Sequence, residues 1–152
     1  MSVPASFRRV IEEGDPDWSP GSQPTFVLIY GLPGKPHLQG YTVKGVAELE
    51  AMVDRMPRFS KKRRAMEHIL STKSSDAQVD DNGRIILSAK LREIAGLNGE
   101  AVFAGANKNF EVWSPEAYAE HEAMLMETID DLGGADALEN IFEELEEDGG
   151  GL

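Results

Sequence analysis

The sequence predicts an α+β fold with a mostly β core, followed by an acidic helical tail. Short runs of β-branched and aromatic residues alternate with helix-start residues, which predicts mixed strands and helices. The order of these elements recurs along the chain, which indicates two similar halves. A length of 152 residues with 41% hydrophobic residues is enough for a compact core.

The first half contains a short helix, two strands and a second helix. Residues 3–11 have an apolar stripe at helical spacing, and Pro4 suits the first turn of a helix. Residues 25–30, TFVLIY, predict a strand, and residues 37–42 can return as its partner. Helical spacing resumes over residues 43–56.

A linker over residues 57–76 predicts a further helix, with Ser60 suited to cap its N-terminus. Residues 61–64, Lys-Lys-Arg-Arg, form the densest basic run of the chain. A phosphate contact, a solvated helix face and a subunit contact all fit this run.

The second half repeats the layout of the first. Residues 78–88 predict strand, turn and strand, and Ser88 can cap a helix over residues 89–95 that ends at Gly96. The elements that complete this half are strands at 100–106 and 110–114, an Asn-Lys-Asn turn between them, and a helix opened by Ser114 and Pro115.

Three matched stretches support a tandem duplication. The pairs are residues 3–8 with 87–92, 26–29 with 101–104, and 41–42 with 113–114. Each unit then reads as strand, helix, strand, strand and a following helix, and the first unit lacks its opening strand. Chance similarity of two short helices is the alternative explanation.

The stretch Asp-Asp-Asn-Gly-Arg at residues 80–84 is the best candidate binding site. The Asn82-Gly83 pair tolerates positive φ and predicts a tight turn. Asp80 can accept backbone N–H bonds inside that turn or pair with Arg84. The turn would present a guanidinium, whose planar fork of donors suits phosphate or guanine. A plain hairpin with a solvated arginine fits the same residues.

The net charge of −12 is concentrated at one end of the chain. Residues 115–152 contain thirteen acidic residues and no Lys or Arg, whereas residues 1–114 contain 15 basic and 14 acidic residues. Local basic groups can therefore still bind phosphate, because binding depends on the local field. Further candidates are Arg8, Arg9, Lys90 and Arg92, near the starts of matching helices, although solvated helix faces explain them as well.

Several classes of function find no support. The chain has no cysteine, its three histidines lack metal-ligand spacing, and GLPGKP lacks the spacing of a phosphate-binding loop. We therefore expect no enzyme, cofactor, metal or small-molecule substrate. The polar first 15 residues and the lack of any apolar run near the ~20 residues that span a bilayer favour a cytoplasmic protein.

The second half resembles the MraZ family. The carrying residues are Asp80-x-x-Gly83-Arg84, the apolar run, Leu91-Arg92, AGL at 95–97 and VFAGANKNFEVWSPEAY at 102–118. The resemblance covers residues 2–123 and implies two AbrB-like, swapped-hairpin-like repeats. The implied domains are a first repeat at 1–56, the linker helix at 57–76, a second repeat at 77–123 and the acidic tail at 124–152.

The resemblance implies a bacterial transcriptional regulator, usually a repressor, of the division and cell-wall gene cluster. Family members bind G-rich direct repeats of double-stranded DNA, associate with the nucleoid and form homo-oligomeric rings of about eight or more subunits. The implied DNA-binding residues are Arg84, Gly83 and Asp80, with Arg8, Lys90 and Arg92 nearby. The alternative is an assembly module with weakened or no DNA binding, because the first basic turn is missing.

The chain departs from the family pattern at its start. Met1 falls where the residue after the first Gly-Arg is expected, so the first strand, its Asp and its Arg are absent. A start assigned too late and a natural truncation both explain this. We favour the first, because residues 2–10 continue the family pattern without a break.

The tail raises a separate question. Leu138, Ile141, Phe142 and Leu145 have helical spacing within residues 137–148. A helix end packed on the body and followed by a disordered GGGL terminus fits this pattern. So does a DNA mimic that competes for the basic turns, or a segment that binds a partner.

Overall fold

The computed structural model describes residues 1–106 and 109–149. The chain forms two compact units, Met1–Pro115 and the residues from Glu116 onward. Mixed helices and strands confirm the α+β class. The expected Asn-Lys-Asn turn and GGGL terminus fall largely on residues 107–108 and 150–152, which lie outside the described part.

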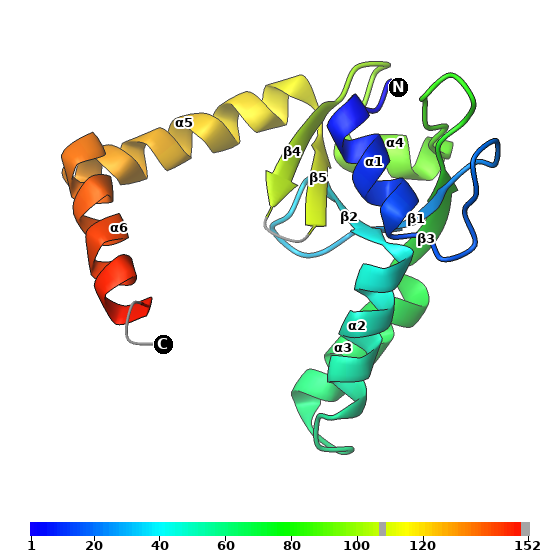
Figure 1. Cartoon of the computed structure of the whole chain (residues 1–152), viewed down its shortest axis with the longest axis horizontal. Coiled ribbons are helices and arrows are strands. Elements are labelled where there is room, and N and C mark those ends of the chain that lie inside the picture. Colours follow the sequence, from blue (N-terminus) through cyan, green and yellow to red (C-terminus); the bar gives the residue numbers. More distant parts are fainter. Residues whose placement is uncertain (107–108, 150–152) are drawn as a thin grey trace. The chain divides into compact units, whose positions relative to one another are not determined.

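Eleven elements follow one another in the described residues (Figure 1). They are α1 Ala5–Glu13, β1 Thr25–Ile29, β2 Leu38–Thr42, α2 Val43–Asp54, α3 Lys61–Thr72, β3 Ser74–Gln78, α4 Ala89–Ala95, β4 Val102–Ala106, β5 Asn109–Trp113, α5 Pro115–Asp131 and α6 Ala135–Gly149. None of these helices is long and apolar enough to cross a membrane.

Side-chain caps fix the starts of three helices. The hydroxyls of Thr42, Ser60 and Ser88 each accept a hydrogen bond from the backbone N–H three residues further on, at 2.9, 3.1 and 3.3 Å. These bonds satisfy N–H groups that have no partner within a helix. Gly96 ends α4 with φ of 64°, a left-handed conformation that glycine adopts at little cost. The caps at Ser60 and Ser88 and the stop at Gly96 are thus confirmed.

One antiparallel sheet joins the two halves of the chain. Its strand order is β3-β1-β2-β5-β4, so β2 of the first half pairs with β5 of the second. The strand predicted from residue 78 lies earlier, as β3, and its first residues belong to the linker that the sequence predicts to be helical. It pairs with β1 of the first half, from Thr25 opposite Gln78 to Ile29 opposite Ser74. The halves are therefore interleaved, and neither has a separate sheet.

The strand expected after the 80–84 turn is reduced to isolated bridges. Ser2 pairs with Arg84, and Val79 pairs with Ile85. The N–H of Val3 donates to the Gly83 carbonyl at 2.8 Å. The pairing stays short because Ser88, three residues after Ile85, already caps α4. The N-terminal segment of the first half is thereby joined to the turn of the second.

The core lies against the sheet and draws on both halves. Phe110 on β5 lies between Phe7 of α1 and Phe26 of β1, with ring centroids 5.7 Å away in each case. Gly40 on β2 is paired with Phe110 on β5, in the line of contact between these two strands that we call the β2–β5 seam. A Cβ atom on Gly40 would overlap the Phe110 ring, so this seam requires a residue without a side chain.

We predict that Gly40→Ala lowers the free energy of unfolding by about 1–3 kcal/mol, because a core of native density resists added atoms. Urea denaturation followed by circular dichroism measures it. Gly105→Ala is the matched control, since Gly105 also lies in a strand but a Cβ atom added there would meet no other atom within 4 Å. Equal losses in the two variants would contradict the role assigned to the seam.

Candidate nucleic-acid interface

The turn at residues 80–84 is held by its own first residue. The Oδ1 atom of Asp80 accepts hydrogen bonds from the backbone N–H groups of Asn82 and Arg84, each at 2.9 Å. The N–H of Asp80 donates to the Arg84 carbonyl at 2.8 Å. Of the two roles expected for Asp80, the structure shows backbone capping, and no ion pair with Arg84 occurs among the described residues.

The backbone of Arg84 is therefore held by hydrogen bonds, whereas its side chain is exposed. Its N–H and carbonyl are both bonded to Asp80, and Ser2 flanks it in an isolated bridge. Its guanidinium makes no hydrogen bond or ion pair within the described part of the chain. The turn therefore presents an exposed arginine side chain from a backbone that hydrogen bonds hold in place.

Arg8 of the first half lies directly against this turn. Gly83 has φ of +72°, and a Cβ atom there would lie 2.7 Å from Nη1 and 3.0 Å from Cζ of Arg8. The Nε atom of Arg8 is buried without a hydrogen-bond partner among the described residues. Two arginines from different halves thus meet at one turn, because the interleaved sheet brings α1 to it.

A shallow depression of about 460 Å³ lies beside Arg84. Its lining includes the amides of Gln23 and Gln78, the carboxylate of Asp76 and the side chain of Ile86. Ile86 is 86% exposed, whereas its neighbours Ile85 and Leu87 are buried. These residues were not predicted from the sequence, although the alternation of buried and exposed positions over 85–87 has the period of an extended segment and could have identified Ile86.

Two predicted cations lie elsewhere. The Nζ atom of Lys90 is 5.2 Å from the ring centroid of Tyr30. Arg92, the counterpart of Arg8 on α4, is exposed. Neither makes a hydrogen bond or ion pair to the 80–84 turn in the described residues. The structure therefore groups Asp80, Gly83, Arg84 and Arg8 and leaves Lys90 and Arg92 outside this group.

The chemistry of the turn and of the depression beside it suits the edge of a nucleic-acid base. An arginine fork matches guanine O6 and N7, glutamine amides match adenine, and an exposed aliphatic side chain can contact a thymine methyl group. The carboxylate of Asp76 would repel phosphate nearby. In the described residues, no three His, Asp or Glu side chains gather where they could hold a metal ion.

Comparison with known proteins places the chain among similar sequences of one family. A family model described as "MraZ protein, putative antitoxin-like" matches residues 71–131, which include the turn. Transcriptional regulator MraZ of Ruegeria sp. (strain TM1040) is 40% identical over 146 residues, covering 96% of this chain and 84% of the relative. The protein of the same name from Ruegeria pomeroyi is 39% identical over 133 residues, covering 87% and 80%. That from Parvibaculum lavamentivorans is 34% identical over 128 residues, covering 78% and 70%.

The fold and the site define a protein of two interleaved halves that exposes an arginine on a tight turn. The chain belongs to the MraZ family, and the relatives named here are transcriptional regulators.

We predict that Asp80→Ala lowers the free energy of unfolding by about 1–3 kcal/mol, because two backbone N–H groups lose a charged acceptor. Asp81→Ala removes an exposed carboxylate next to it and should change the stability by less than ~0.5 kcal/mol. Thermal and urea unfolding of both variants provide the measurement. An equally stable Asp80→Ala protein would show that the turn holds its shape without this side chain.

Proposed function

We propose that the chain binds double-stranded DNA in a sequence-specific manner through its 80–84 turn, as a transcriptional regulator of the MraZ family. The observation that carries the proposal is the placement of Arg84 on an ordered turn. Its backbone is bonded to Asp80 on both sides, while its exposed guanidinium has no partner in the described residues. The backbone of the turn is already ordered, so binding a guanine or a phosphate needs to order only the Arg84 side chain, whose planar fork of donors matches either group.

Arg8 and Arg84 have separate roles in this proposal. Arg84 reads a base edge or contacts a phosphate, and Arg8 supports the turn from α1 and adds positive charge beside it. Gln23, Gln78 and Ile86 would contact the flanking bases. Lys90 and Arg92 would make weaker phosphate contacts from α4.

Assembly completes the proposed function. One turn offers few contacts, so a single copy would bind weakly. A homo-oligomeric ring of about eight or more subunits, acting on G-rich direct repeats, gains affinity because each further contact forms at high effective concentration. We propose the division and cell-wall gene cluster as the target, repression as the usual outcome, and association with the nucleoid.

A second candidate is an assembly module that binds DNA weakly or not at all. The observation that favours it is the carboxylate of Asp76 in the depression beside Arg84, together with exposed Asp81 in the turn. These groups repel phosphate, and the chain has only one Asp-x-x-Gly-Arg turn. Measuring DNA affinity and particle mass on the same sample separates the two functions.

We predict that Arg84→Ala weakens binding to a G-rich direct-repeat duplex about 10-fold or more, because a bidentate arginine–guanine pair contributes ~1–3 kcal/mol. Fluorescence anisotropy across a salt series measures this. Arg84→Lys keeps the charge without the fork, so it should recover nonspecific affinity but not sequence preference. Lys44→Ala, which removes an exposed cation from α2, is the control. Unchanged affinity in Arg84→Ala at matched salt would contradict the proposal.

We predict that Gly83→Ala reduces DNA affinity more than Gly34→Ala does. Both glycines have similar positive φ, +72° and +73°, so both variants should lose about 1–2 kcal/mol of stability. Only at Gly83 would the new Cβ displace Arg8, because no atom lies within 4 Å of the equivalent position at Gly34. Equal affinities of the two variants in the anisotropy assay would exclude Arg8 from the site.

A further inference from the structure

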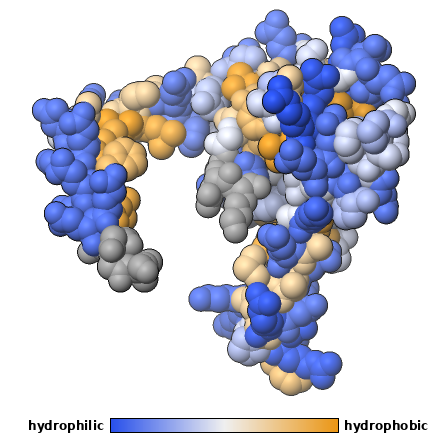
Figure 2. Space-filling view, viewed as in Figure 1, coloured by the Kyte–Doolittle hydropathy of each residue, from blue (hydrophilic) through white to orange (hydrophobic). Residues whose placement is uncertain are grey.

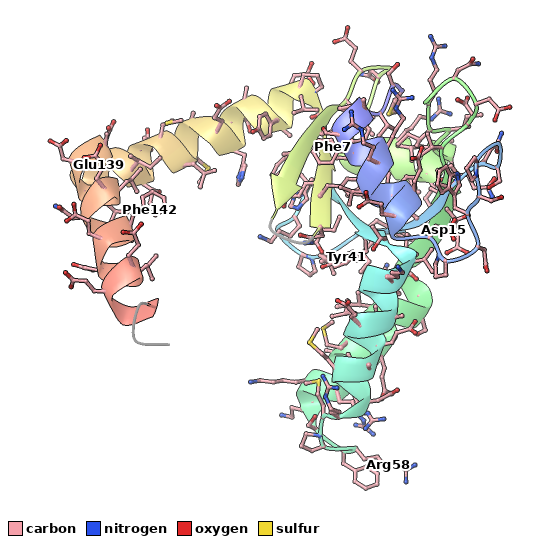
Figure 3. The ribbon with its side chains drawn as sticks, viewed as in Figure 1. Phe7, Asp15, Tyr41, Arg58, Glu139 and Phe142 are labelled. Atoms are coloured by element: carbon pink, nitrogen blue, oxygen red, sulfur yellow. The ribbon has the colours of Figure 1, made fainter. Side chains whose placement is uncertain are left out.

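The unit that follows Pro115 exposes most of its apolar side chains. No residue of α5 is buried, and Met124 on that helix is 67% exposed. On α6, Phe142 and Leu145 are 66% and 60% exposed. Figure 2 shows apolar residues gathered where α5 meets α6, and Figure 3 shows Phe142 on that side of α6. We call α5 and α6 the arm, and this surface its apolar face.

The arm needs a partner on physical grounds. Helical stability in proteins comes mainly from the packing of an apolar face, since isolated helices of this length are marginal in water. Figure 2 shows exposed apolar residues of the arm gathered where its two helices meet, and such patches mark interaction surfaces. The apolar face therefore requires a covering surface.

The charge of the arm restricts what that surface can be. The residues from Glu116 onward carry thirteen acidic side chains and no Lys or Arg. Seven of the acids lie on α6. DNA and other polyanions are thereby excluded as the partner, and a basic surface with apolar side chains is favoured.

The turn between α2 and α3 provides such a surface. Residues 55–64, which we call the basic tip, contain six basic side chains and no acidic ones. Phe59 at its centre is 85% exposed, and Figure 3 shows Arg58 projecting at this end of the helix pair. Arg63 is used internally, in a hydrogen bond of 2.6 Å to Glu67. The other five cations form no ion pair among the described residues.

We propose that the arm of one copy docks on the basic tip of a second copy. The apolar face covers Phe59, and the acids of α6 lie against the cations around it. This interface rests on the assembly in the proposed function and specifies how copies meet. Each copy offers one arm and one tip, so the contact is heterologous, and heterologous contacts repeated by rotation close into rings.

The length of α5 suits this role. Its 17 residues form one unbroken helix, about 26 Å long at 1.5 Å per residue. Gly133 and Gly134, both with positive φ, then turn the chain into α6. The arm therefore carries its docking helix on a stiff spacer, which is a means of reaching a neighbouring copy.

Charge reversal tests the interface. The tip variant is Arg58→Glu/Lys61→Glu/Lys62→Glu, and the arm variant is Glu143→Lys/Glu146→Lys/Glu147→Lys. Light scattering after size exclusion gives the particle mass of each full-length protein. We expect each variant alone to lose mass relative to wild type, and their mixture to recover it, since opposite charges face each other again. Glu13→Lys/Glu48→Lys/Glu100→Lys makes the charge change of the arm variant at exposed sites outside the arm and should keep the wild-type mass.

Three results would overturn the interface: a wild-type particle with the mass of one chain, a tip variant of wild-type mass, or a mixture that recovers nothing. The last result is expected if each arm covers the tip of its own chain.

Arg84→Ala keeps DNA binding and assembly distinguishable, because it should lose DNA affinity at unchanged mass. Deletion of residues 126–152 should lower the number of copies per particle as well. Tighter DNA binding by the deleted chain at an unchanged number of copies would show instead that the arm competes with DNA.

Discussion

Pairing of β2 with β5 across the β2–β5 seam is the interaction on which the rest of Met1–Pro115 depends. It joins the β4–β5 hairpin, which would be marginally stable alone, to the three strands β3, β1 and β2. The seam is close-packed, because Gly40 leaves room for the Phe110 ring, which in turn contacts aromatic rings from α1 and β1. Backbone pairing and aromatic packing thus reinforce each other at one place, and the helices attach around it.

Interleaving has a direct consequence for the candidate site. The first half supplies Arg8 and the N-terminal segment, and the second half supplies the Asp80–Arg84 turn. The turn is therefore braced by Asp80 from within and by the other half from outside. Such bracing restricts the backbone of Arg84 while its side chain remains available, which is the arrangement that a recognition residue needs.

Acidic and basic residues are concentrated in different parts of the chain, and the proposed DNA binding and assembly use different parts as well. The folded body is close to neutral, so a few cations at the turn and at the basic tip determine the local field there. The acids are concentrated on the arm, which also carries the exposed apolar side chains. In the proposed function, DNA recognition and contact between copies therefore use different surfaces.

The sequence by itself determined the local features of this protein. Helix starts at Ser60 and Ser88, the stop at Gly96 and the tight turn around Gly83 follow from short-range hydrogen bonding and backbone sterics, which a few neighbouring residues decide. Arg84 could be selected from the sequence as a candidate DNA-binding residue because it belongs to this tight turn. Only the tertiary structure decided that β3 crosses to β1, that Arg8 packs on Gly83 while its counterpart Arg92 does not, and that Ile86 faces outward beside Arg84. These features depend on contacts between residues distant along the chain, and local preference carries no information about which of several similar strands will pair.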